Sequence, residues 1–177
     1  MSTQFRPRRS VLYMPGSNAR VLEKAKTLPA DCLILDLEDA VAPDMKETAR
    51  AQVSETVKAG GYGKRELIIR VNGFGTTWGE EDLKPAIAAR PDAILLPKVE
   101  TAEDITKLSD MMNEAGAPDR LKLWAMMETP LAMLNAKEIG AAAKAGGSRL
   151  SAWGMGTNDL AKETGAKLGG DRLPMIS

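Results

Sequence analysis

Short runs of apolar residues alternate along the chain with longer segments in which apolar residues recur every three or four positions. The short runs are rich in Leu, Ile and Val, as in buried strands, and the longer segments are typical of amphipathic helices. This alternation predicts βα units around a parallel sheet. Strands are expected over residues 10–14, 32–36, 66–71, 93–97, 121–127 and 149–154, and helices over 19–28, 44–58, 80–89, 102–115 and 131–145.

The strand spacing favours a barrel over an open doubly wound sheet. The strands are almost continuously hydrophobic, and polar residues follow their carboxyl ends. A complete barrel has eight strands and about 250 residues. The 177 residues therefore predict an α/β fold, a TIM (β/α)8-type barrel truncated after about six βα units. We expect residues 1–177 to form a single barrel domain that lacks the last strands and the C-terminal segment of a complete one.

Composition narrows the possible chemistry. Lys plus Arg and Asp plus Glu number 24 each, so no global field attracts nucleic acid or an acidic membrane. The sequence has no long apolar stretch and no signal-like N-terminus, which predicts a soluble cytoplasmic protein. The single cysteine, Cys32, is expected to be a buried structural residue. Histidine is absent, which excludes Ser-His and Cys-His nucleophile pairs and leaves carboxylates, Arg, Lys, backbone amides or a hard cation.

Polar residues gather at the expected carboxyl ends of the strands, which share one mouth in a barrel. Arg70 and Glu128 each end an apolar strand, where an unpaired charge would cost several kcal/mol, so each needs a partner. Glu128 and Asp159 together suit Mg²⁺, although a structural ion pair with Arg70 is an alternative. The full set is Asp36, Glu38, Asp39, Arg70, Asn72, Lys98, Glu100, Glu128, Asn158 and Asp159.

The segment "YMPGSN" follows the first expected strand and leads into a helix. Ser17 and Asn18 could cap that helix, which is the commoner role of such residues. Free amides there could also bind a phosphate, helped by Arg9, Arg20 and Lys24.

Several segments, taken in order, resemble one known family. They are "RSVLYMPGSN", "LILDLEDAVAPDMKETAR", "IIRVNG", "LLPKVE", "METP" and "GTNDLAKE". Together they resemble the citrate lyase β-subunit-like family of CoA ester lyases, with malyl-CoA lyases, citryl-CoA lyases and malyl-CoA thioesterases. The segments are most similar to the short malyl-CoA thioesterase branch. The resemblance implies barrels that need Mg²⁺, with Mn²⁺ possible, act on CoA thioesters, and assemble as trimers or hexamers.

The resemblance also implies roles for individual residues. Glu128 and Asp159 would be the metal ligands. Arg70 would bind the thioester oxygen as a catalytic residue, and Glu38 and Asp39 would hold Arg70 and line the pocket. The residues expected toward the CoA moiety are Tyr13, Arg9 and Lys24.

The expected reaction is cleavage of a 3-hydroxyacyl-CoA such as malyl-CoA or citryl-CoA to acetyl-CoA and an oxo acid. In this retro-Claisen reaction the metal and Arg70 would stabilise the enolate. Thioester hydrolysis at the same residues is an alternative, and a non-catalytic CoA-binding or assembly role and a pyruvate-type aldolase are others. The segment that lends an Asp to the neighbouring subunit in lyase members is not found here, so the activity of this chain stays open.

Overall fold

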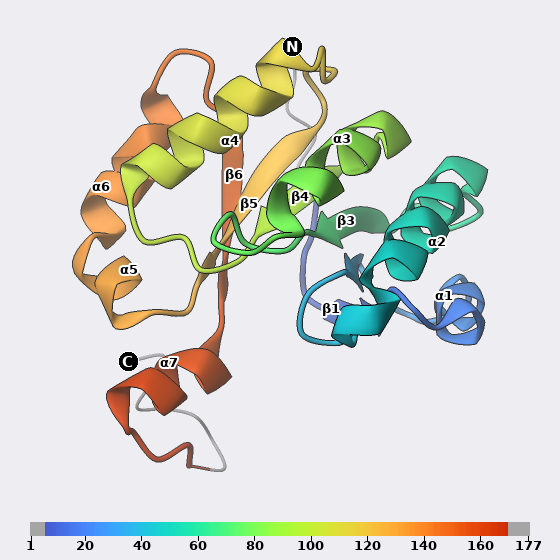
Figure 1. Ribbon diagram of the computed structural model, residues 1–177, viewed down its shortest axis with the longest axis horizontal. Coiled ribbons are helices and arrows are strands. Elements are labelled where there is room, and N and C mark those ends of the chain that lie inside the picture. Colours follow the sequence, from blue (N-terminus) through green and yellow to red (C-terminus); the bar gives the residue numbers. More distant parts are fainter. Residues whose placement is uncertain (1–5, 170–177) are drawn as a thin grey trace. The chain divides into compact units, whose positions relative to one another are not determined.

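The computed structural model describes residues 6–169, which form two compact units (Figure 1). Unit 1 ends at Ile94 and unit 2 begins at Leu95, so the boundary falls inside the strand β4 (Ala93–Leu96). The alternation of strands and helices confirms the predicted α/β class. The single barrel domain over residues 1–177 stays a prediction.

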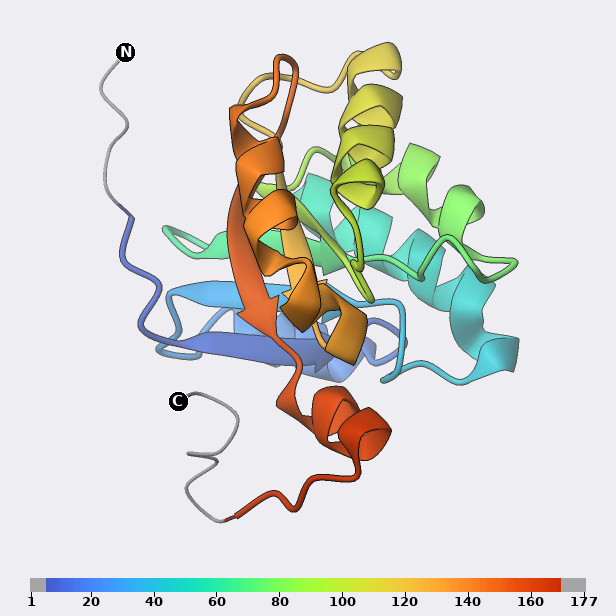
Figure 2. The same ribbon diagram turned by 90° about the vertical axis from the view of Figure 1, so that its left-hand side faces the viewer.

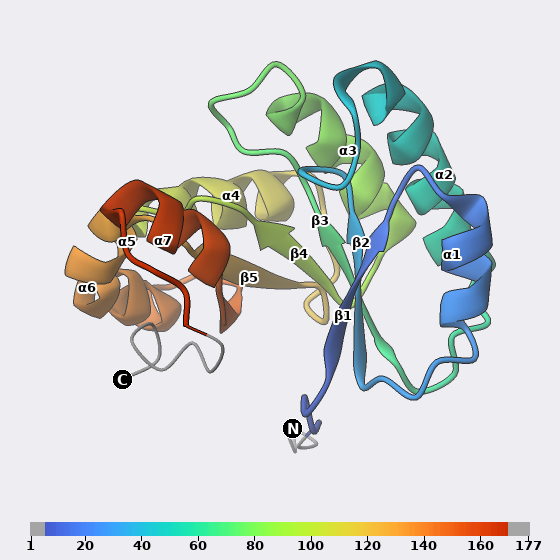
Figure 3. The same cartoon turned by 90° about the horizontal axis from the view of Figure 1, so that it is seen from below.

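Unit 1 is built on parallel strands with the order β1-β2-β3. Leu12 of β1 is in register with Leu33 of β2, and Leu33 with Leu67 of β3. Figure 3 shows the helices α1 and α2 on one side of these strands. The elements are β1 (Val11–Pro15), α1 (Ala19–Ala25), β2 (Cys32–Asp36), a 3-10 turn (Pro43–Met45), α2 (Lys46–Ala59), β3 (Glu66–Arg70) and α3 (Gly79–Ala89).

The core of unit 1 lies on the two inner strands. Every residue of β2 and β3 is buried, as expected for parallel strands covered on both faces. Gly16, just after β1, donates its backbone N–H to the carbonyl of Asp36 at 2.8 Å. This close approach requires glycine, because a Cβ there would overlap that carbonyl. The close approach brings the loop after β1 against the carboxyl end of β2.

Cys32 opens β2 and is completely buried, which confirms the prediction. Its sulfur lies 3.5 Å from Oε2 of Glu66, in donor position. Burial, reinforced by the negative charge of Glu66, raises the pKa of the thiol to about 12. Cys32 is therefore a protonated, unreactive thiol under ordinary conditions.

Unit 2 contains the parallel pair β5 and β6, followed by a short helix (Figure 2). The backbone N–H of Val99, just after β4, donates to the carbonyl of Met126 in β5 at 3.2 Å. Figure 2 shows α6 against one side of β5 and β6. The elements after β4 are α4 (Ala102–Glu114), β5 (Lys122–Met127), α5 (Pro130–Leu134), α6 (Ala136–Ala141), a 3-10 turn (Ala142–Lys144), β6 (Leu150–Met155) and α7 (Thr157–Thr164).

Two predictions in unit 2 need correction. The helix expected over 131–145 is interrupted at Asn135, whose side chain donates to the carbonyl of Glu100 at 2.9 Å. Asn158 and Asp159, expected in a loop, lie in the first turn of α7, which forms because Leu160 and Ala161 are buried on one face. The helix predicted over 102–115 begins as expected, with Thr101 as the N-cap of a capping box.

The other predicted elements agree with the structure to within a few residues at their ends. Across the described residues, no helix combines the length and the apolar character that a membrane span requires.

Candidate functional site

Arg70 is the last residue of β3 and lies among three carboxylates. Its Nε and Nη2 donate to the two carboxylate oxygens of Asp36 at 2.7 and 2.6 Å, a bidentate pair. Its Nη1 lies 2.7 Å from Glu38 and 3.3 Å from Asp39. The predicted pairing with Glu38 and Asp39 is confirmed, whereas the bidentate partner, Asp36, was not predicted as such.

Asp36 holds the arginine and the loop after β2 at once. The register of the parallel strands places it opposite Arg70. Besides the arginine, its carboxylate accepts the backbone N–H of Glu38 at 2.8 Å and that of Ala40 at 3.1 Å. One buried carboxylate thus fixes the guanidinium and the segment that carries Glu38 and Asp39.

Burial and charge oppose each other at Arg70. Burial alone would lower the pKa of Arg70, but the hydrogen bonds and charge of Asp36, with the charge of Glu38, raise it above its usual value. The guanidinium is therefore cationic at any pH at which the protein folds. The Tyr13 ring lies over it, with 5.0 Å from the guanidinium carbon to the ring centroid. Tyr13, from β1, is 42% exposed, so it forms the solvent side of the cluster.

Lys46 supports the same loop from the first turn of α2. Its Nζ donates to the carbonyls of Leu37 and Glu38, both at 2.8 Å, and to Oδ1 of Asn72 at 2.7 Å. Burial lowers the pKa of Lys46, and the surrounding carboxylates, Asp36 first, oppose that effect. The ammonium holds the backbone on which Glu38 and Asp39 stand.

Asp82 completes this support from α3. Its carboxylate accepts from Nε of Arg50 at 2.7 Å and from the Asn72 side chain at 2.6 Å. It also accepts the backbone N–H of Asn72 at 2.9 Å. Asp82 and Arg50 therefore fix Asn72, and through it Lys46 and the loop after β2.

Unit 2 has its own charged group at the carboxyl ends of its strands. Lys98, two residues after β4, donates its backbone N–H to Oε1 of Glu128 at 2.9 Å. Its Nζ donates to Oδ2 of Asp159 at 3.1 Å. Lys98 has a φ of 50°, a left-handed conformation that is uncommon outside glycine. One residue thus contacts both predicted metal ligands.

The surroundings of Glu128 and Asp159 fit a hard cation. Glu128 is buried, and the Asp159 side chain is 30% exposed. Gly156 lets the turn before α7 pack directly against Glu128, because a Cβ at that position would overlap both Cβ and Oε2 of the glutamate. Among the described residues, no group of three or more His, Cys, Asp or Glu could hold a metal. One or two carboxylates, completed by water and substrate oxygens, are nevertheless a ligand set that Mg²⁺ commonly uses.

The residues expected toward CoA do not all lie at one place. Tyr13 is beside Arg70, but Arg9 precedes β1 and so lies at the amino end of the strands, where it pairs with Asp31. Lys24 is exposed on α1. The Asn18 side chain caps α1 by accepting the N–H of Val21 at 3.2 Å, as predicted. The substrate roles of Tyr13, Arg9 and Lys24 stay predictions.

Sequence reasoning did not assign roles to Lys46, Asp82 or Lys98, and it placed Asp36 among the carboxylates that position Arg70 without making it the main partner. Lys46 and Asp82 sit in the first turns of helices, where charged residues are common and attract no notice. Asp36 could have been found, since a strand that ends in Asp beside a parallel strand that ends in Arg predicts their pairing.

Comparison with known proteins identifies the family of the chain. The sequence profile described as "HpcH/HpaI aldolase/citrate lyase" matches residues 9–172. The chain belongs to the HpcH/HpaI aldolase/citrate lyase family. The resemblance found in the sequence is therefore confirmed.

Family relatives include a (3S)-malyl-CoA thioesterase of Cereibacter sphaeroides, 51% identical over 99% of this chain and 58% of the relative. The citrate lyase subunit beta of Escherichia coli is 35% identical over 89% of this chain and 52% of the relative. The chain thus spans a little over half the length of these curated relatives. The relatives are named as a thioesterase and as lyases, among them the citramalyl-CoA lyase of Homo sapiens.

A solved family structure supports the fold. The protein CitE from Mycobacterium tuberculosis, in complex with magnesium, acetoacetate and coenzyme A, has a TM-score of 0.69 to this chain. The match is 28% identical and covers 91% of this chain and 54% of that one. The predicted fold class, a (β/α) barrel type with about six βα units, is confirmed.

Proposed function

We propose that the protein acts on malyl-CoA or a closely similar 3-hydroxyacyl-CoA thioester, with Arg70 as the group that stabilises the reacting thioester oxygen. The observation that carries the proposal is the Arg70 cluster. The guanidinium is held by Asp36, Glu38 and Asp39 before any substrate arrives. The name of the Cereibacter sphaeroides relative, a malyl-CoA thioesterase, supports the substrate.

Arg70 keeps donor capacity for a substrate. A guanidinium has five N–H groups; three of them donate to Asp36 and Asp39, and Glu38 adds an ion pair at 2.7 Å. A remaining N–H, such as the second one on Nη2, would donate to the thioester oxygen as it gains negative charge. Because the guanidinium is already oriented, the donor needs no reorganisation during the reaction. Tyr13, over the face of Arg70, would exclude water from the cluster.

Glu128 and Asp159 would hold Mg²⁺, or Mn²⁺, with the buried Glu128 beside Gly156 and Lys98 between the two carboxylates. A bound divalent cation would polarise the hydroxyl and carboxylate of the acid portion of the substrate. The magnesium in the CitE structure supports the choice of metal. Arg70 ends β3, Glu128 follows β5 and Asp159 follows β6, so each unit carries its own charged group at the carboxyl ends of its strands.

Hydrolysis and carbon–carbon cleavage both place negative charge on the thioester oxygen, so the Arg70 cluster serves either reaction. The relative at 51% identity supports hydrolysis to malate and free CoA. The lyase reaction predicted from the sequence remains the second candidate, supported by the citrate lyase subunit beta of Escherichia coli. Binding of the CoA moiety is supported by the coenzyme A in the CitE structure.

The test uses this chain and a form completed to the length of its relatives. Each is incubated with malyl-CoA and Mg²⁺, and the products are separated by chromatography. Free CoA with malate indicates the thioesterase reaction, and acetyl-CoA with an oxo acid indicates the lyase reaction. Absence of both from the completed, folded protein would contradict the proposal. The predicted trimer or hexamer and the cytoplasmic location are separate predictions, which light scattering and cell fractionation check.

A further inference from the structure

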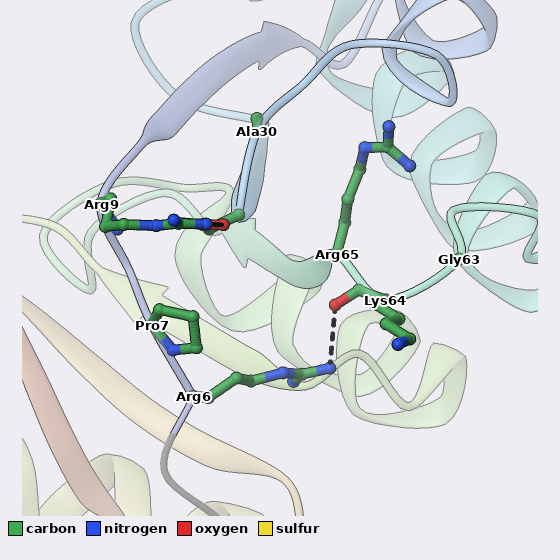
Figure 4. A pocket seen from close by; sticks show the side chains of 8 residues that line it. Arg6, Pro7, Arg9, Ala30, Gly63, Lys64 and Arg65 are labelled. Carbon is green, nitrogen blue, oxygen red and sulfur yellow. Dashed lines mark hydrogen bonds and ion pairs between the residues drawn. The ribbon is translucent and has the colours of Figure 1, made fainter.

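A cavity of about 970 Å³ lies in unit 1, away from the Arg70 cluster. The residues that line it come from the segments just before β1, β2 and β3 (Figure 4). Arg70 and Asp36 end their strands, whereas this cavity lies at the amino ends. A strand such as β1 has five residues, which at about 3.3 Å per residue separates its two ends by roughly 15 Å.

The cavity carries an excess of positive charge. Its charged lining consists of Arg6, Arg9, Lys64 and Arg65 with a single carboxylate, Asp31. Arg9 is neutralised, because its Nε and Nη2 donate to Asp31 at 2.9 and 2.8 Å. Arg6 forms an ion pair with Asp92 at 3.1 Å and reaches the carbonyl of Lys64 at 3.4 Å, the dashed bond in Figure 4.

Lys64 and Arg65 account for the remaining charge. Arg65 is bonded to backbone carbonyls, those of Leu28 and Tyr62, at distances of 2.5 to 3.0 Å. These bonds anchor its side chain, use three of its five N–H groups and supply no opposite charge. Among the residues that the structure describes, Lys64 has no ion pair and Arg65 none with a carboxylate.

The volume and the charged groups of the cavity indicate which class of anion it would bind. A volume near the upper end of the range for small-molecule sites suits a compact soluble molecule. The chain as a whole is neutral, so no extended positive surface favours nucleic acid or a membrane. Lys64 supplies a point charge and Arg65 a fixed planar donor group, a combination that suits phosphate oxygens.

We propose that this cavity binds a small soluble oligophosphate, separately from the site that takes the thioester. Lys64 and Arg65 contact the phosphates, and Arg6 and Arg9 border them. Because the ligand sits at the amino ends of the strands, where a barrel carries stability rather than catalysis, it acts as an effector that stabilises unit 1. Gly63, with a φ of 64°, gives the turn the conformation that brings Lys64 to the rim.

The test is isothermal titration calorimetry of the full chain with inorganic triphosphate. One equivalent should bind, and orthophosphate should bind at least about tenfold more weakly, because it spans fewer of the charges. Lys64→Glu should weaken triphosphate binding about tenfold or more, since it reverses an exposed charge at the rim. Lys84→Glu, the same change on an exposed position of α3, should leave the affinity within about twofold.

A second variant tests the location. Arg20→Glu alters an exposed residue in the first turn of α1, directly after the carboxyl end of β1, and should leave triphosphate binding unchanged. A large loss in Arg20→Glu with none in Lys64→Glu would overturn the proposal, because the anion would then sit at the other end of the strands. Undetectable binding at millimolar triphosphate, or equal losses in Lys64→Glu and Lys84→Glu, would overturn it as well. Circular dichroism spectra verify that each variant is folded.

Discussion

In unit 1 the Arg70 guanidinium is buried among carboxylates that fix it from several sides, whereas in unit 2 the Lys98 side chain is half-exposed and reaches one carboxylate with its ammonium. A buried cation held by several carboxylates keeps its orientation and costs nothing to reorganise when charge develops on a substrate. A half-exposed Lys–Asp pair contributes little and exchanges readily. The Arg70 guanidinium is therefore oriented in advance, whereas the Lys98 ammonium can leave Asp159, as the proposed metal ion requires.

The largest expected effect comes from Glu128, the buried carboxylate of unit 2. Glu128→Ala in the completed protein should lower kcat on malyl-CoA about a thousandfold or more, because several kcal/mol of charge stabilisation would be lost. The residual rate should no longer respond to Mg²⁺ or to EDTA. Glu163→Ala, an exposed carboxylate of α7, is the matched control. If the Glu128→Ala protein retained its dependence on Mg²⁺, Glu128 would not be a ligand of the metal.

Arg70→Lys tests whether unit 1 acts through an oriented donor or only through charge. An ammonium cannot keep the bidentate bond to Asp36 and also donate to a substrate oxygen. We expect kcat to fall about a hundredfold to a thousandfold with little change in KM, as when one oxyanion donor is removed. Steady-state kinetics measure this. Full activity in Arg70→Lys would mean that charge alone suffices.

Asp36→Asn should destabilise unit 1 without affecting unit 2. The substitution leaves a buried guanidinium without its main partner, which costs about 3 kcal/mol. Trp78 lies in unit 1, and Trp124 and Trp153 lie in unit 2, so single-tryptophan variants report the units separately during urea unfolding. We expect the urea midpoint reported by Trp78 to fall and those reported by Trp124 and Trp153 to stay unchanged. Equal shifts at all three tryptophans would mean that the two units unfold as one.

The sequence predicted the elements better than it predicted the charged network. The periodicity of apolar residues located the strands, because a buried parallel strand must be apolar along its length. It could not foresee the break at Asn135, which depends on a hydrogen bond to the distant carbonyl of Glu100. Arg70 was identified because a charge at the end of a buried strand demands a partner. Lys46 was missed because its burial depends on where the loop after β2 folds.

The smallest effect is expected at the amino ends of the unit 1 strands, in acid. Hydrogen bonds from Arg9 lower the pKa of Asp31 to about 2, from its ordinary value of 3.8. A lowered folded-state pKa stabilises the fold above pH 4, and this stabilisation is lost as pH falls from about 4 to about 2. In Asp31→Asn, the Trp78 urea midpoint should depend slightly less on pH within that window. An unchanged acid dependence would show that the exposed pair contributes nothing.

The reactivity of the single thiol can report how often unit 1 opens. Cys32 is the sole cysteine of the sequence and is completely buried in β2. Its thiol has a pKa of about 12, so it is protonated at neutral pH. Its thiolate can therefore form and attack an aromatic disulfide reagent only while the strand is transiently open. When reclosing is faster than attack, the labelling rate divided by that of an unfolded peptide gives the equilibrium constant for opening. No probe has to be engineered, and openings confined to unit 2 leave the label untouched.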